Sequence, residues 1–183
     1  MVSILVSYLA ILASTFTLLS WILPQDLLLK LLRITPLISS TANLMWAADE
    51  YMFLSSWLSP AYRVQANALL PAWFATWGKK GSHVLFSSFP LSLVAGILNI
   101  FTSEDVTGKM WYGAGVAFTF AHFLYGKKAL RLLAAIRNGE PKGNATESMR
   151  EWIEMHLFRV VTADAPAFVS FAGALLMAIP EVS

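Results

Sequence analysis

The sequence predicts an all-α fold, a polytopic transmembrane helix bundle with a four-helix core and an additional apolar helix at the N-terminus. The 183 residues are 57% hydrophobic and 13% charged, whereas soluble domains are about 45–50% apolar and about 25% charged. The apolar residues form long runs that end at prolines or short polar turns. This pattern indicates that much of the protein surface contacts lipid.

The first apolar run covers residues 2–23 and ends at Pro24. It is long enough to cross about 30 Å of hydrocarbon. A signal peptide is the competing interpretation, but the run has no early Lys or Arg and no clear small-x-small cleavage site. We therefore expect a division into 1–25, an N-terminal apolar helix that acts as a fifth span or signal anchor, and 26–183, a four-helix transmembrane domain.

Four further apolar runs predict the core helices of the bundle. They cover residues 27–58, 81–101, 110–125 (continuing as a helix towards 136) and 152–179. Asn144 and Glu147 precede the last run with the spacing of a capping box, which predicts that its helix starts there.

Charge then predicts how the bundle is oriented. The segment 59–80, a loop or interfacial segment, and the segment 126–150, which begins as the continuing helix, are expected to connect the spans on one side of the membrane, and together they carry nine Lys and Arg residues. The other side has only Lys30, Arg33 and Lys109. By the positive-inside rule the nine-residue side is cytosolic, in an integral membrane protein of the endoplasmic reticulum. Asn144 begins an Asn-Ala-Thr sequon, and we expect it to stay unglycosylated in the cytosol.

Ionisable side chains fall at a similar predicted depth on four helices, and they include every histidine of the chain. The candidate catalytic residues are His156, Arg159, His122, His83, Asp49, Glu50 and Asp164. Charges within a span are costly and usually face protein or a cavity. One interpretation is a pocket open to the cytosolic leaflet and flanked by aromatic side chains. The candidate substrate-binding residues are Trp46, Tyr51, Phe86, Phe118 and Tyr125.

In the catalytic interpretation, His156 or His122 removes a proton from an activated C–H bond. Arg159 stabilises the resulting oxyanion, and the carboxylates orient the imidazole. A structural interpretation stands beside it, in which Asp49 or Glu50 pairs with Arg159 and locks two helices together. A metal site of His and acids was a third interpretation, but the chain lacks the Glu-x-x-His motif of bundle di-metal sites, and we predict no metal. Without cysteine, thiolate haem and iron–sulfur sites are excluded.

Five short segments resemble small fungal integral membrane proteins similar to the anthrone-oxygenase-like family. They are residues 49–60, 69–73, 131–136, 144–152 and 155–159, and the last contains a His-x-x-Arg element, His156 to Arg159, that family members commonly carry in their final helix. The resemblance covers about 31–179. It implies oxidation of polyketide anthrones to anthraquinones without metal, flavin or haem, in secondary-metabolite clusters, and it leaves open cyclisation or rearrangement.

The sequence and the resemblance together predict a cofactor-independent membrane enzyme of fungal secondary metabolism, an oxidoreductase of the monooxygenase type. Its substrate is expected to be a hydrophobic, aromatic, polyketide-like molecule that is oxidised through a base-generated carbanion. The alternatives are a cyclase or isomerase acting on a similar substrate and a non-enzymatic membrane scaffold. A transporter is disfavoured because the short chain has no internal repeat. Expected partners are this small molecule and membrane lipid, with no nucleic acid, and oligomerisation is left open.

Overall fold

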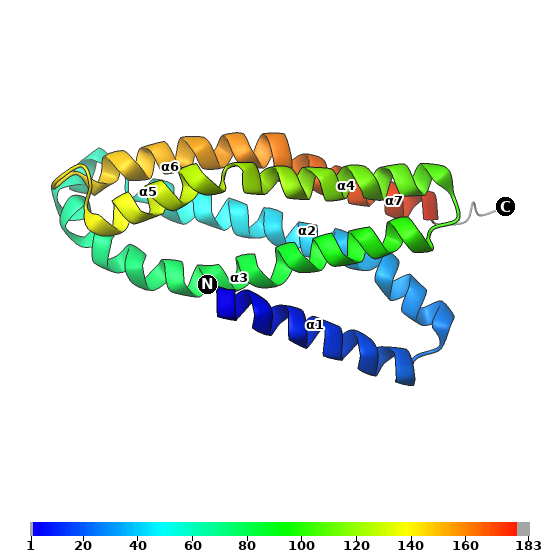
Figure 1. Cartoon of the computed structure of the whole chain (residues 1–183). Coiled ribbons are helices and arrows are strands. Elements are labelled where there is room, and N and C mark those ends of the chain that lie inside the picture. The colour runs from blue at the N-terminus through cyan, green and yellow to red at the C-terminus, as the bar shows by residue number, and fades with distance from the viewer. Residues whose placement is uncertain (1, 179–183) are drawn as a thin grey trace.

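The computed structural model describes residues 2–178, and in that part the chain is all helical. The helices, labelled in Figure 1, are α1 (Val2–Ile22), α2 (Gln25–Ser56), α3 (Arg63–Thr102), α4 (Val106–Leu124), α5 (Gly126–Asn138), α6 (Ala145–Arg159) and α7 (Ala165–Ala178). A single 3₁₀ turn, η1 (Pro60–Tyr62), precedes α3, and a π-helical turn, η2 (Val160–Asp164), joins α6 to α7. The prediction of an all-α fold is confirmed.

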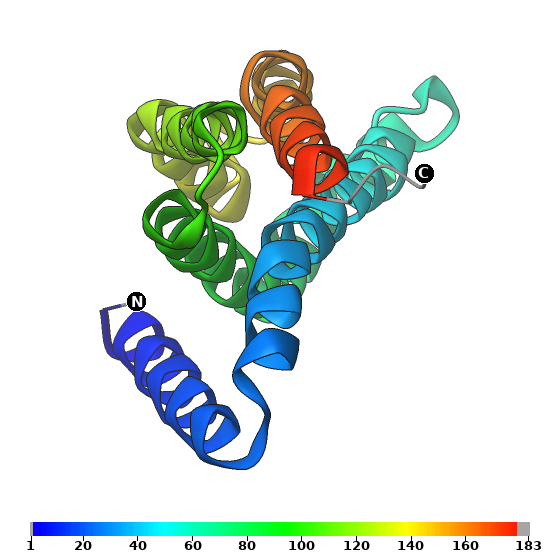
Figure 2. The same ribbon diagram turned by 90° about the vertical axis from the view of Figure 1, so that its right-hand side faces the viewer.

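Four antiparallel columns form the bundle: α2, α3, α4 followed by α5, and α6 continuing through η2 into α7 (Figure 1). Figure 2 shows α1 leaning away from these columns. Near its N-terminal end, α1 contacts α3 through the Tyr8 hydroxyl, which lies 3.2 Å from Nδ1 of His83. The division at residue 25 stays a prediction.

Two helical stretches, Pro60–Thr102 and Ala145–Ala178, are long and apolar enough to cross a membrane. A shorter apolar stretch is Val6–Ile22. The number of spans in the bundle therefore stays a prediction.

The expectation of a loop at 59–80 is wrong for most of that segment, because residues 63–80 are helical, whereas the expected continuation of the fourth run as a helix towards 136 is confirmed by α5. Residues 63–80 are the first half of α3, and α5 occupies most of the first half of 126–150. The apolar side chains of these two helical segments pack against each other and against α6. Leu70, Phe74, Leu132 and Met149 are each at most 3% exposed in this shared core. The bundle therefore extends as a packed structure well past the long apolar runs.

A second core lies at the opposite end, where α4 packs closely against α7. The Phe171 ring is fully buried there with Tyr112 and Ala174. A Cβ atom added to Gly115 would lie only 2.5 Å from a ring carbon of Phe171. Gly115 therefore allows the two helix backbones to approach.

Helix α6 begins where the capping pattern predicted, but its cap comes from another helix. Asn144 is the N-cap residue, yet its side chain accepts no capping hydrogen bond from the backbone. Instead Oδ1 of Asn67 in α3 accepts the Thr146 backbone N–H at 2.9 Å. The Asn67 side-chain amide donates to Oδ1 of Asn144 at 3.2 Å, while the Asn144 side-chain amide donates to Glu147 at 2.9 Å. The predicted capping box is wrong in its bonding, since Glu147 binds the cap side chain rather than its backbone N–H.

The predicted final span is interrupted by η2, and Pro166 explains why. Proline has no backbone N–H, and its ring collides with the carbonyl four residues earlier in a regular helix. Here the chain widens, and the Ala165 N–H bonds to the Val160 carbonyl, five residues back. Such a turn places residues i and i+5 over each other. It therefore brings Arg159 and Asp164 onto one face.

Candidate functional site

Five of the predicted ionisable side chains meet inside the bundle, between α2, α4 and the α6–η2 column. We call this group the polar cluster; its members are Glu50, His122, His156, Arg159 and Asp164. Their side chains are between 1% and 11% exposed. Buried charged groups need partners, so the cluster is defined by how its members satisfy each other.

Both ring nitrogens of His156 are engaged. Arg159 donates from Nη2 to Nδ1 of His156 at 2.8 Å, so Nδ1 acts as the acceptor. The proton is therefore assigned to Nε2, which donates to the backbone carbonyl of Ala47 in α2 at 2.9 Å. With both nitrogens bonded, His156 connects α6 to α2 and positions Arg159.

Glu50 and Trp152 hold the other sides of Arg159. Oε2 of Glu50 lies 3.8 Å from Nη2 of Arg159 and 3.3 Å from Nδ1 of His156. The guanidinium carbon of Arg159 lies 5.6 Å from the centre of the Trp152 ring, within range of a cation–π interaction. Trp152 is also stacked on His156, with ring centres 6.0 Å apart. Arg159 is thus fixed by a carboxylate, an imidazole and an indole.

His122 and Asp164 form a second pair, in which Nδ1 of the imidazole and Oδ1 of the carboxylate are 2.7 Å apart. An ionised carboxylate only accepts, so Nδ1 carries the proton. The other nitrogen, Nε2, has no hydrogen-bond partner among the described residues, and its lone pair is free to take a proton. The ring lies against Phe89 of α3, with centres 4.0 Å apart. A carboxylate that orients an imidazole in this way is a common arrangement for a general base.

Arg159 joins the two pairs. Its Nε lies 3.8 Å from Oδ2 of Asp164, beyond hydrogen-bonding distance, and it is buried without a partner in the described structure. With both carboxylates ionised and both imidazoles neutral, the cluster carries a net charge of −1. One added proton makes it neutral, so the cluster can accept a proton without burying a net charge.

Asp49 and His83 lie outside the polar cluster. Asp49 is half-buried and takes part in none of the described hydrogen bonds or ion pairs, whereas its neighbour Glu50 points into the bundle. His83 is exposed and contacts Tyr8 of α1. The polar cluster therefore comes from three helical columns rather than from the four helices predicted. Helix α3 contributes Phe89 and no histidine to it.

The five predicted aromatic residues do not line one pocket. Tyr51 is 43% exposed and Phe118 is 37% exposed on the bundle surface. Phe86 is half-buried, and Trp46 is stacked on Trp77. Tyr125 is nearest to the π turn, with its hydroxyl 2.9 Å from Oγ1 of Thr162. Their assignment to substrate binding stays a prediction.

Sequence reasoning missed two aromatic residues that contact the cluster, Trp152 and Phe89. Trp152 lies one helical turn before His156, and this i, i+4 spacing was the available signal. It also missed polar pairs between α2 and α3: Ser39 bonds Ser92 at 2.7 Å, and Ser88 donates to the Asn43 amide oxygen. Nothing in the sequence identified the α3 partners.

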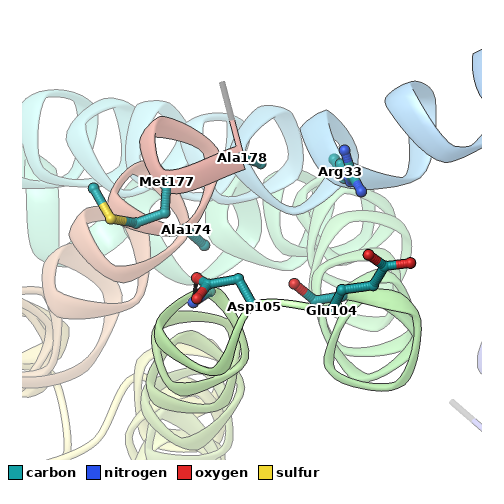
Figure 3. Close-up of a pocket in the computed structure, with 8 residues that line it drawn as sticks. Arg33, Glu104, Asp105, Ala174, Met177 and Ala178 are labelled. Carbon is teal, nitrogen blue, oxygen red and sulfur yellow. Dashed lines mark hydrogen bonds between the residues drawn. The ribbon is translucent and has the colours of Figure 1, made fainter. Parts of the chain in front are cut away.

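No three His, Cys, Asp or Glu side chains among residues 2–178 are placed to hold a metal ion together. A pocket of about 200 Å³ lies at the far end of the bundle, where the α3–α4 turn meets the beginning of α2 and the end of α7 (Figure 3). Arg33, Glu104 and Asp105 provide its charged rim, and Ala174, Met177 and Ala178 its apolar wall. Ala174 follows Asp164 by ten residues, or about 15 Å of helix, so this pocket is separate from the polar cluster.

The chain is similar to fungal proteins of secondary metabolism over most of its length. It is 44% identical to "Probable epoxidase scpX" of Mollisia scopiformis, over 83% of this chain and 98% of that protein. It is 39% identical to "Epoxidase pydX" of an Acremonium species, over 82% of this chain and 96% of that protein. "Oxaleimides biosynthesis cluster protein N" of Penicillium oxalicum is 31% identical, over 79% of this chain and 87% of that protein. No family model and no solved structure matches the chain.

Proposed function

Because the chain belongs to the fungal secondary-metabolism family that includes the epoxidases scpX and pydX, we propose that it forms an epoxide on an apolar pathway intermediate. Family membership supports an oxidative tailoring enzyme. The finer parts of the proposal are the catalytic residues, the independence from a cofactor, and the action within a membrane.

The observation that carries the catalytic assignment is the His122–Asp164 pair. In the predicted mechanism either His156 or His122 was the base, and the geometry favours His122. Nδ1 of His122 is held by Asp164 at 2.7 Å, and Nε2 has no hydrogen-bond partner in the described part of the chain, whereas both nitrogens of His156 are bonded. In our proposal His122 removes the proton, Asp164 orients it, and Arg159 stabilises the oxyanion. His156, Glu50 and Trp152 position Arg159.

The proposed chemistry needs dioxygen but no external reductant. His122 takes a proton from an acidic C–H of the substrate, and the carbanion is delocalised onto an oxygen beside Arg159. Single-electron transfer to O₂ and recombination give a peroxide, which is protonated to a hydroperoxide. The hydroperoxide gives one oxygen atom to a C=C bond, which becomes the epoxide, and the other oxygen remains as an alcohol. One C–H, one C=C and one O₂ thus give one C–OH and one epoxide.

A membrane setting is supported by three of the four columns, in which Lys or Arg residues recur at a common level. Lipid of about 30 Å takes about 20 residues of helix. Counted back along α3 from Thr102, this length ends at His83, a few residues short of Lys80 and Lys79, and counted back along α7 from Ala178 it ends at Arg159. Along α4 it ends just before Lys127. The polar cluster then lies at and just inside the cytosolic boundary, at the level of the lipid headgroups.

The test begins in the producing fungus, where deletion of the gene should cause a precursor with fewer oxygen atoms to accumulate. That precursor is then supplied to microsomes from yeast that express the protein. His122→Ala and Arg159→Ala should abolish conversion in folded protein, while His83→Ala, at the exposed α3 position, should convert like wild type. With ¹⁸O₂ and no added NAD(P)H, both labelled atoms should enter the product.

Each part of the proposal can fail separately. Wild-type rates in His122→Ala would remove the proposed base. A strict need for a nicotinamide cofactor would overturn the cofactor-free scheme but leave the epoxidase. A product without added oxygen would favour the cyclase or isomerase. The oxidation of an anthrone to an anthraquinone stays a prediction from the resemblance.

A further inference from the structure

Four tryptophans form a continuous ladder along the seam between α2 and α3. Trp46 and Trp77 have ring centres 5.4 Å apart and an interplanar angle of 15°. Trp77 and Trp73 are 5.7 Å apart at 14°, and Trp73 and Trp57 are 5.2 Å apart at 50°. Four of the seven tryptophans of the chain are therefore in consecutive ring contact, which we call the indole ladder.

The inner end of the indole ladder lies at the polar cluster. Trp46 precedes Glu50 by one helical turn of α2, so the two side chains lie on the same face of that helix. Its neighbour Ala47 supplies the carbonyl that binds His156 at 2.9 Å. The outer end, Trp57, follows the last residue of α2 at the end of the bundle. The ladder thus connects the candidate site with the aqueous end of the protein.

The ladder depends on a close contact that the sequence makes room for. A Cβ atom added to Gly81 would lie 2.6 Å from a ring carbon of Trp46. Because residue 81 is glycine, the Trp46 ring lies flat against α3 and reaches Trp77. Simple core filling accounts for buried indoles, but these four rings are each only half-buried.

We propose that the indole ladder carries oxidising equivalents away from the polar cluster. Indole is among the side chains most easily oxidised by one electron, and stacked rings exchange electrons readily. This inference rests on the proposed function, since it takes as its oxidant an organic peroxyl radical, which forms when superoxide escapes before recombination and the substrate radical captures a second O₂. The ladder would protect the buried histidines and Arg159 from that radical.

The peroxyl radical gains one electron from Trp46 and the N–H proton that the oxidised indole releases through the Glu50 carboxylate, and becomes a hydroperoxide. Electron transfers from Trp77, Trp73 and Trp57 in turn move the radical outward to Trp57, and Trp46 regains a proton from water through Glu50. A low-molecular-weight thiol in water then reduces the Trp57 radical by one electron and releases its S–H proton, which balances the proton taken up. Two of the resulting thiyl radicals combine to one disulfide.

The ladder is tested without the substrate, in proteoliposomes containing a lipid-soluble azo initiator that releases peroxyl radicals in air. Oxidised tryptophans are mapped by mass spectrometry in wild type, in Trp77→Phe and in Trp73→Phe. Phenylalanine keeps a ring in the stack but is far harder to oxidise. Trp21 is 86% exposed on α1, outside the ladder, and serves as the internal reference for direct attack by radicals.

In either variant, oxidation of Trp57 relative to Trp21 should fall several-fold, and oxidation of Trp46 and His156 should rise. Equal ratios in wild type and both variants would overturn the ladder, because Trp57 would then be oxidised directly. Since no turnover is involved, this outcome is separate from failure of the proposed function, which would appear as the absence of an oxygenated product with wild-type protein.

Discussion

At the scale of single residues, His122 and His156 differ in what their ring nitrogens are free to do. His156 is bonded on both sides, to Arg159 and to the Ala47 carbonyl, whereas His122 is bonded, within residues 2–178, only through Nδ1 to Asp164. The sequence placed both histidines at a similar depth but could not tell them apart, because the difference lies in partners from other helices.

Asp164→Asn tests the orienting role of the carboxylate. The side chain keeps its size, but its amide can turn the N–H₂ group toward Nδ1 of His122. Nδ1 then accepts a hydrogen bond, and the single N–H proton of the neutral imidazole lies on Nε2. That nitrogen is then a donor and no longer a base. We expect kcat to fall by at least about 100-fold, the lower range for a general base, with little change in melting temperature. Unchanged kcat in this variant would exclude Asp164 from the reaction.

At the same scale, the sequence pattern could not show whether Glu50 or Asp49 faces Arg159. Adjacent residues on a helix project about 100° apart, and either could have faced Arg159 in a sequence with apolar residues all around. The structure places Glu50 within 3.8 Å of Arg159 and leaves Asp49 out. Exchanging the charges of Glu50 and Arg159 together, by Glu50→Arg with Arg159→Glu, should recover part of the stability lost in either single variant. The same exchange with Asp49 should recover none, as measured by thermal unfolding in detergent.

At the scale of elements, the contact between α4 and α7 gives a matched pair of glycines. A Cβ at Gly115 would lie 2.5 Å from the Phe171 ring, whereas a Cβ at Gly113 would meet nothing within 4 Å. Gly115→Ala should destabilise the protein by about 1–3 kcal/mol through overpacking. Gly113→Ala should be neutral or stabilise by up to about 1 kcal/mol through helix propensity. Unfolding monitored by circular dichroism distinguishes them, and equal effects would contradict the close packing.

The π turn η2 provides a second test at this scale. Pro166→Ala restores a backbone N–H that can bond the Thr162 carbonyl, so a regular helix becomes available and the stability should hold or rise. A regular helix does not place residues five apart on one face, and Asp164 would turn away from Arg159 and His122. We therefore expect activity to fall while the melting temperature does not. A variant that keeps full activity would show that the cluster does not depend on η2.

The apolar runs predicted the elements well where a helix is apolar along its whole length. They failed at 63–80, where the composition is mixed, because the interfacial aromatic residues and lysines were interpreted as a loop or interfacial segment. Their packing partners, such as Met149 of α6, are far away in sequence. The position of η2 was also missed, although Pro166 was the visible signal for it.

At the scale of the whole molecule, the orientation in the membrane stays a prediction and can be tested directly. The chain has no cysteine, so in a single-cysteine variant only the introduced thiol can react with a maleimide. In intact microsomes, whose cytosolic face is outward, Lys128→Cys should react with a membrane-impermeant maleimide. Glu104→Cys, at the opposite end, should react only after detergent is added. The reverse result would invert the topology, and reaction of both in intact vesicles would mean that the bundle does not cross the membrane.

The level of the polar cluster has a consequence for the direction of material flow. An apolar substrate partitions into lipid and is concentrated there, beside Phe89 and Phe123, which lie against His122. In the proposed orientation and reaction, the product gains an epoxide and a hydroxyl, which lower its partition coefficient, and it forms at the cytosolic boundary. The difference in solubility alone would then supply substrate from the lipid and release product to the cytosol, so that the bundle would act at the boundary between these two solvents.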